Sequence, residues 1–230
     1  MCPYESREKG PNVKKLCRKL GPALIAWPIA LAGMLNGSDA QAQHEFDPKL
    51  VAMLPPYCKY TEYYRQAVPG GDDPPTTERW RSLLGPQNFI HLHHYCFGLE
   101  NTNRALYFSR SKLERDRELN SSVGEFDYVI ARVARDFALL PEMLTKRGEN
   151  KLRLGNGPQG LVDLSRALEL KPDHWPPYAA LSDYYRELGD LDSAREWAEK
   201  GLAAAPGTRA LERRLSELKK TKTPRPASAN

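Results

Sequence analysis

The segment from His91 to Cys96 carries side chains of the types that hold metal ions or haem. Three of the chain's five histidines, His91, His93 and His94, lie here next to Cys96. Imidazole nitrogens and cysteine sulfur are common ligands of zinc and copper. In a helix, however, His93 and His94 diverge by about 100°, so the four side chains cannot all reach one ion without distortion. We therefore predict a buried, hydrogen-bonded cluster with no cofactor, and keep a metal or haem site as the alternative.

The cysteines bear on the same segment. Cys2 and Cys17 lie near the N-terminus, whereas Cys58 and Cys96 are the two that follow it. An even pair in an oxidising compartment can form one disulfide, and this one would join the region of Cys58 to the histidine-bearing segment. Two buried free thiols are an equally good interpretation, because cysteine also packs well as a small core residue.

Other patterns that carry catalysis do not occur in the sequence. There is no serine in a G-x-S-x-G turn, no glycine-rich phosphate loop and no H-E-x-x-H. Glu125 and Asp127 are two residues apart on a predicted helix, so they point to different sides and do not form an acid–base pair. We predict that the chain is not an enzyme. A second polar and aromatic cluster could line a ligand groove or anchor the N-terminal loops: Tyr57, Tyr60, Tyr63, Tyr64, Arg79, Trp80, Arg81, Asn101, Asn103 and Arg104.

The first 42 residues have the pattern of a secretory signal peptide. A basic stretch ends at Lys19, an apolar stretch runs over residues 22–35, and Ala40-Gln41-Ala42 supplies the small residues that a signal peptidase needs. We predict cleavage after Ala42 and a periplasmic or secreted protein. The alternative is an uncleaved anchor in the inner membrane. No apolar run reaches the roughly 18 residues of a confident span, so we predict no span in the mature chain.

The basic character of the chain also belongs mainly to this leader. The whole sequence has a formal net charge of +5, and residues 1–42 hold six Lys or Arg against three Asp or Glu. A protein that binds nucleic acid would normally keep a basic face on its folded part. We therefore expect no nucleic-acid partner.

The region from residue 43 onward is predicted to be all-α. Residues 43–78 are rich in turn-forming prolines and should be a loop segment with one short helix between Cys58 and Ala67. Residues 79–140 should form an atypical helical unit. Within it, apolar residues recur at helical spacing. One expected helix contains Phe89, Leu92, Cys96, Leu99 and Leu106, and a second runs from about Ser122 to Leu140, burying Phe126, Val129, Ile130, Val133 and Phe137.

The next part of the chain contains an internal repeat, because residues 141–174 align with residues 175–208 at an offset of 34. Small residues or proline occupy matching positions: Gly155 and Gly189, Ala167 and Gly201, Pro172 and Pro206. The second copy also has Tyr178, Leu181, Ser182, Tyr185, Ala194 and Ala198 at helical spacing, and the first has Leu144, Gly148, Gly160 and Leu164. This pattern resembles the tetratricopeptide repeat family. Arg147 and Lys151 depart from it, because aromatic or apolar residues are usual there.

The resemblance implies a short helical-repeat solenoid of antiparallel helix pairs. Two repeats alone cannot bury a continuous core, so the 79–140 unit must pack on the first repeat. Residues 209–220, with an apolar stripe at Leu211, Leu215 and Leu218, should form a cap helix. Residues 221–230 should be a disordered tail.

The resemblance also implies a groove formed by the first helices of the stacked repeats. By helical phase, the polar candidates that face this groove are Glu149, Arg153, Asp183, Arg186 and Glu187. Their mixed charge favours a polar segment of another protein or peptide as the ligand. We predict an exported, non-enzymatic adaptor or scaffold that serves a cell-envelope assembly, and the last step rests on family analogy alone. The alternative is a periplasmic metal- or cofactor-handling protein using His91, His93, His94 and Cys96.

Overall fold

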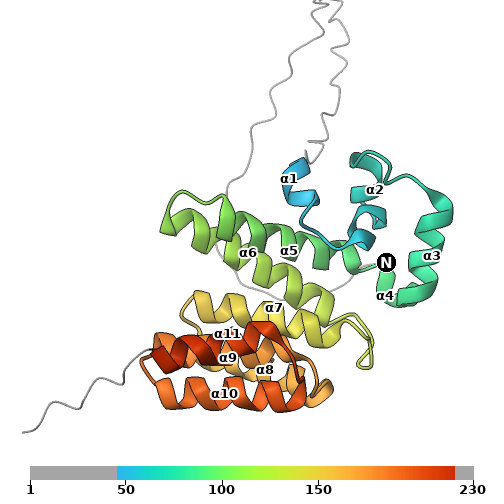
Figure 1. The fold of residues 1–230 in the computed structure, drawn as a ribbon. Coiled ribbons are helices and arrows are strands. Elements are labelled where there is room, and N and C mark those ends of the chain that lie inside the picture. Colours follow the sequence, from blue (N-terminus) through green and yellow to red (C-terminus); the bar gives the residue numbers. More distant parts are fainter. Residues whose placement is uncertain (1–45, 221–230) are drawn as a thin grey trace, which may run out of the picture. The chain divides into compact units, whose positions relative to one another are not determined.

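The computed structural model describes residues 46–220, and this part of the chain contains helices and no strands (Figure 1). The predicted signal peptide and the predicted tail at 221–230 lie outside the described residues. Five short helices come first: α1 (Pro48–Val51), η1 (Pro56–Tyr60), α2 (Tyr64–Ala67), α3 (Pro74–Leu84) and α4 (Pro86–Phe89). Seven longer ones follow: α5 (Leu92–Tyr107), α6 (Lys112–Ile130), α7 (Leu140–Arg153), α8 (Gly157–Leu170), α9 (Trp175–Glu187), α10 (Leu191–Ala204) and α11 (Arg209–Lys220).

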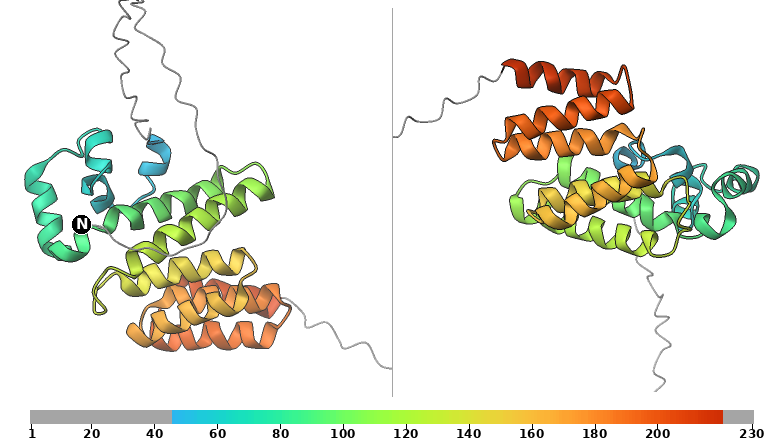
Figure 2. Two further views of the ribbon diagram at one scale, coloured as in Figure 1. Left: turned by 180° about the vertical axis from the view of Figure 1, so that it is seen from behind. Right: turned by 90° about the horizontal axis from the view of Figure 1, so that it is seen from below.

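The longer helices pack as successive pairs. The strongest contacts join α5 to α6, α7 to α8 and α9 to α10, and each pair also contacts the next. Figure 2 shows α9, α10 and α11 lying side by side. The all-α prediction is therefore confirmed for residues 46–220, as is the packing of adjacent helix pairs that a helical repeat requires.

The 34-residue offset is present in the helices themselves. Helices α8 and α10 begin at Gly157 and Leu191, and they end at Leu170 and Ala204. Gly155 and Gly189 precede them with φ values of +83° and +82°, which residues with a side chain rarely adopt. The matching turns thus reverse the chain at matching places.

Close helix contacts explain why small residues occupy the inner faces of the pairs. A Cβ atom added to Gly148 on α7 would lie 3.0 Å from the carbonyl oxygen of Gly160 on α8. Ala194 and Ala198 on α10 are fully buried. The two departures from the repeat pattern also have a structural reason. Arg147 and Lys151 both bind the buried carboxylate of Asp163 on α8, with nitrogen–oxygen distances of 2.6–2.9 Å.

A buried polar link joins the α5–α6 pair to the first repeat. Asn150 on α7 is fully buried, and its Nδ2 donates to Thr102 Oγ1 on α5 at 2.7 Å and to Ser122 Oγ on α6 at 2.9 Å. Ser122 in turn donates to the carbonyl of Gly98 at 2.6 Å. Since unpaired buried polar groups are costly, this network favours one docking of the three helices.

Three expectations about individual helices are wrong. The helix predicted from about Ser122 to Leu140 begins at Lys112, where Ser111 Oγ caps the Glu114 amide, and it ends at Ile130. A turn follows, and α7 begins just before Pro141, a residue suited to the first turn of a helix. The apolar stripe that starts at Phe89 also does not form one helix.

Phe89 belongs to the separate helix α4, and Leu106, at the far end of the same stripe, is exposed rather than buried. The segment 43–78, expected to be a loop with one short helix, instead contains α1, η1 and α2 in its described part, and α3 begins within it at Pro74. Proline is well placed there because the first helical turn needs no amide donor from it.

Candidate partner-binding groove

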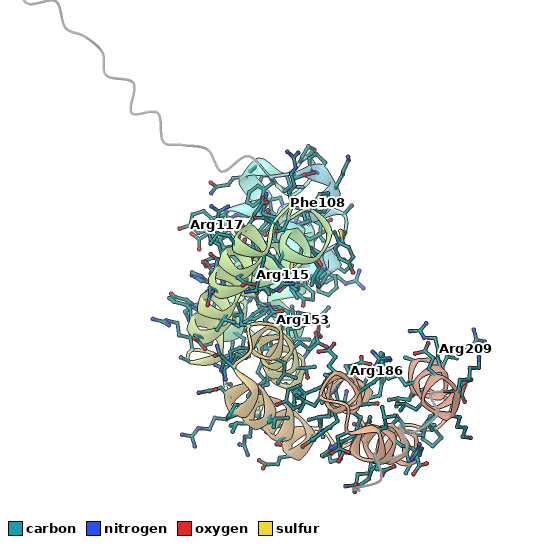
Figure 3. The ribbon with its side chains drawn as sticks, turned by 90° about the vertical axis from the view of Figure 1, so that its left-hand side faces the viewer. Phe108, Arg115, Arg117, Arg153, Arg186 and Arg209 are labelled. Carbon is teal, nitrogen blue, oxygen red and sulfur yellow. A yellow bond between two sulfur atoms is a disulfide. The ribbon has the colours of Figure 1, made fainter. Side chains whose placement is uncertain are left out.

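Helices α7 and α9, the first helices of two successive pairs, form a groove together with α11. Helix α7 contacts α9, and α9 contacts α11, while α8 and α10 lie behind them. Figure 3 looks along the helices and shows Arg153, Arg186 and Arg209 on the same side of α7, α9 and α11. A Cβ atom on Gly201 of α10 would lie 2.7 Å from Tyr178 and 2.8 Å from Leu211, so glycine allows α9 and α11 to pack closely over α10.

The groove has a volume of about 530 Å³. All five residues predicted by helical phase lie on its wall: Glu149, Arg153, Asp183, Arg186 and Glu187. The structure therefore brings together the residues that the sequence places on two separate helices. Their role in binding a partner stays a prediction.

Ion pairs across α9 and α11 hold one side of the groove in place. The carboxylate of Asp183 accepts hydrogen bonds from Arg214 at 2.5 and 3.0 Å and lies 3.0 Å from the guanidinium of Arg186. Arg186 also donates to Glu217 at 3.4 Å. These half-exposed side chains are therefore oriented before any ligand arrives, which lowers the entropic cost of binding.

The α7 side of the groove has a comparable set of contacts. Glu149 lies 3.5 Å from Lys146 and 3.6 Å from Arg153. Arg153 also donates to the side-chain oxygen of Asn150 at 3.1 Å, which ties the groove to the buried polar link of the fold. The α7 side and the α9–α11 side of the groove thus both carry acidic and basic side chains. A ligand with charges of both signs could pair with them.

Several groove residues were missed by the sequence analysis. They are Glu142, Lys146, His174, Trp175, Arg213 and Arg214, together with the small or apolar residues of the floor. Arg214 and Glu217 face Asp183 and Arg186 with a constant separation of 31 residues, so α11 acts as a further wall and not only as a cap.

His174 and Trp175 contribute an aromatic end to the groove. Both line it just where α9 begins, and Trp175 is partly exposed. Burial lowers the pKa of His174 below its usual range; Glu142 opposes this effect, whereas Lys171 and Lys146 add to it. The imidazole is therefore neutral at pH 7 and adds no charge to this end of the groove.

Cys96 and His94, two of the candidate metal ligands, already have partners within the protein. Cys58 and Cys96 form a disulfide, so the sulfur of Cys96 is not available as a thiolate ligand. Nδ1 of His94 lies 2.6 Å from Glu125 Oε2, and its ring lies 3.7 Å from that of Tyr128. Within residues 46–220, no group of three or more His, Cys, Asp or Glu side chains is placed to hold a metal ion.

Part of the second aromatic and arginine cluster anchors the N-terminal helices to α5. Tyr64 is fully buried and donates to Glu100 at 2.7 Å, and Arg104 donates to the other oxygen of Glu100 at 2.8 Å. Tyr57 is also buried and packs edge-on against Trp80. These contacts favour the anchoring interpretation for these residues. Tyr60 instead lines a separate apolar hollow of about 500 Å³ beside α1 and η1.

Among residues 46–220, no helix combines the length and the apolar character needed to cross a membrane.

Comparison with known proteins gives one informative similarity. No protein-family model matches the chain. Over 111 residues, 47% of its length, the chain is 30% identical to a wheat (Triticum aestivum) protein named Hsp70-Hsp90 organizing protein. The chain spans 19% of the length of that relative. This similarity and the successive helix pairs support a tetratricopeptide-like helical repeat.

Proposed function

We propose that the chain is a non-enzymatic adaptor that holds a segment of another protein in the groove of α7, α9 and α11. The observation that carries this proposal is that Glu149 and Arg153 of α7 and Asp183, Arg186 and Glu187 of α9 line one groove. Oriented polar side chains around a concave surface are typical of binding sites. The wheat relative is named for organising two other proteins, which supports protein binding as the general activity.

The groove wall favours an extended, polar ligand that carries both charges. Its acidic and basic groups already pair with each other, as Asp183 does with Arg186 and Arg214. A purely apolar ligand would bury these pairs without replacing their contact with water, which is unfavourable. A segment with charges of both signs could form its own ion pairs with these acidic and basic side chains. Trp175 offers one apolar contact at the end of the groove.

Export is a further part of the proposal and rests on the N-terminal pattern alone. The basic stretch, the apolar residues 22–35 and Ala40-Gln41-Ala42 support cleavage after Ala42. A role in a cell-envelope assembly is proposed by family analogy alone. Mass spectrometry of the protein from an exporting host would then find Gln43, or a residue close to it, at the N-terminus. Intact Met1 on cytoplasmic protein would rule out export without affecting the groove.

Site-specific crosslinking can test the groove directly. A photoreactive amino acid at position 213, which is exposed on the groove wall, should trap the partner in cells and allow mass spectrometry to identify it. The matched control is position 162 on α8, where Val162 is equally exposed but does not line the groove. Equal crosslinking at the two positions would contradict the proposal.

Substitutions supply a second test on the same crosslinking signal. Arg186→Ala and Arg153→Ala together should lower the yield at position 213, because both remove cations from the groove wall. Arg166→Ala is the matched control, since Arg166 also pairs with a residue three positions away, Glu169, but lies on α8 outside the groove. The melting temperature should stay close to that of the wild type in each case. An unchanged yield with Arg153, Asp183 and Arg186 all replaced would place the binding surface elsewhere.

A further inference from the structure

Four large apolar side chains are exposed at and beside the turn between α5 and α6. Leu106, Tyr107, Phe108 and Leu113 are all exposed, and Leu113 reaches 83%. Tyr107 ends α5, and Leu113 is the second residue of α6, so the group occupies the end of this helix hairpin. Isolated exposed apolar residues are ordinary, but several at one protruding turn indicate a surface that contacts something else.

The fold does not need these side chains in order to form the turn. Ser111 Oγ caps α6 by accepting from the Glu114 amide, and Glu114 in turn accepts from the Arg110 amide at 2.8 Å. The inner face of the hairpin is filled by other residues, among them Leu99 and Leu119, which are buried. The packing of the hairpin therefore does not explain why the side chains at its tip (Leu106, Tyr107, Phe108 and Leu113) are apolar.

Basic side chains in the first turns of α6 are more exposed than the acids with which they pair. Lys112 is 79% exposed and Asp116, its partner, 23%; Arg117 is 71% exposed and Glu118, its partner, 15%. Figure 3 shows Phe108, Arg115 and Arg117 at the same end of the hairpin. The outermost charges of the tip are therefore positive, although acids are present beneath them.

We propose that the end of the α5–α6 hairpin is a contact site for the surface of an anionic lipid bilayer. Tyr107, Phe108 and Leu113 would enter the interfacial region, where amphipathic aromatic rings and aliphatic side chains are favoured. Lys112 and Arg117 would meet the anionic headgroups while their aliphatic stems cover apolar surface. A convex tip of this kind suits a deformable lipid surface, and its outward positive charge is complementary to anionic headgroups.

Flotation with lipid vesicles tests the proposal on the full chain. Vesicles of phosphatidylglycerol and phosphatidylcholine should bind the protein, and vesicles of phosphatidylcholine alone should bind it at least about tenfold more weakly. Raising the salt concentration should also release it. Lys112→Gln with Arg117→Gln should weaken binding by about fivefold for each charge removed. Tyr107→Ser with Leu113→Ser should weaken it by about tenfold or more.

The design includes two controls. Leu83→Ser removes a leucine of α3 that is exposed at 64% and lies outside the tip, so it should bind vesicles like the wild type. Every variant keeps the same apolar residues 22–35, so any binding through that stretch is common to all of them. Circular dichroism should show the same helix content throughout, because the replaced tip side chains are exposed.

Three results would each overturn the proposal. The first is equal binding to anionic and zwitterionic vesicles. The second is wild-type affinity after Tyr107→Ser with Leu113→Ser, and the third is an equal loss after Leu83→Ser. None of them affects the groove, because the tip residues do not line it.

Discussion

The carboxylate of Asp183 on α9 accepts two hydrogen bonds from the guanidinium of Arg214 on α11. Both side chains are partly buried, with exposed fractions of 29% and 19%. The pair joins the last helix to the second repeat, and on its other side Asp183 orients Arg186. One carboxylate thus contributes both to the docking of α11 and to the arrangement of the groove.

Asp183→Ala should therefore destabilise the protein more than an ordinary surface change. It leaves Arg214 partly buried without its acidic partner, and we expect a loss of about 1–2 kcal/mol in the free energy of unfolding. Urea denaturation followed by circular dichroism measures this. Asp192→Ala on α10 is the control, because Asp192 pairs with Arg195 but is almost fully exposed. Its cost should stay within about 0.5 kcal/mol, and an equal loss from both variants would contradict the expectation.

Replacing glycine by alanine should destabilise the protein at Gly148, where α7 and α8 approach closely, and stabilise it at Gly124 on α6. In Gly148→Ala the new Cβ would lie 3.0 Å from the backbone oxygen of Gly160 and 3.1 Å from Leu164, so α7 and α8 must shift by a few tenths of an ångström. We expect a loss of about 1–3 kcal/mol. Gly124 lies within α6 and has nothing within 4 Å of an added Cβ. Gly124→Ala should thus stabilise the protein by about 0.5–1 kcal/mol, since alanine favours the helix. Thermal unfolding would measure both shifts, and a stabilised Gly148→Ala would show that the helices are packed less closely.

The repeat could be predicted from the sequence because its spacing depends on local chemistry. Gly155 and Gly189 adopt positive φ at turns 34 residues apart, and any sequence comparison at that offset finds them. The groove residues of α7 and α9 followed from helical phase for the same reason. Helical phase thus predicts which residues of a helix face the groove where turn glycines in the sequence also mark the ends of that helix.

The remaining features depend on partners that are distant in the sequence. Arg214 belongs to the groove only because α11 packs beside α9, and no pattern within 209–220 states that. The apolar spacing of Val133 and Phe137 suggested a helix, yet both are buried from the turn between α6 and α7. For Val133 and Phe137, periodicity indicated burial correctly but not the backbone conformation that buries them.

The disulfide gives a prediction that separates the two interpretations of the cysteines. Cys58 and Cys96 are bridged across 38 residues, and both are buried. By the chain-entropy argument, closing a loop of that length stabilises the folded protein by up to about 4 kcal/mol. Cys58→Ser with Cys96→Ser should lower the free energy of unfolding accordingly. Thiol labelling of the unfolded, unreduced protein should modify neither Cys58 nor Cys96. Labelling of both would favour the free-thiol interpretation and leave the helical fold unaffected.

The buried histidine predicts how stability changes with pH. Burial, together with the nearby His94 and His91, lowers the pKa of His93 to about 4 from an ordinary value of 6.5. Between these two values the unfolded chain binds a proton at this position that the folded chain does not. The free energy of unfolding must therefore fall as the pH is lowered from about 6.5 to about 4, and above that window this group adds no pH dependence.

His93→Phe removes the titrating group but keeps an aromatic ring beside Tyr63, whose ring centroid lies 5.1 Å from that of His93. Urea midpoints of the variant should fall less steeply than those of the wild type between pH 6.5 and 4, with the two curves running parallel above pH 7. Carboxylates titrate in both proteins, so the difference between the curves isolates the histidine. Parallel curves over the whole range would mean that His93 is protonated in the folded state as easily as in the unfolded chain. The ring would then not be buried beside Tyr63 and Phe97 as the structure has it.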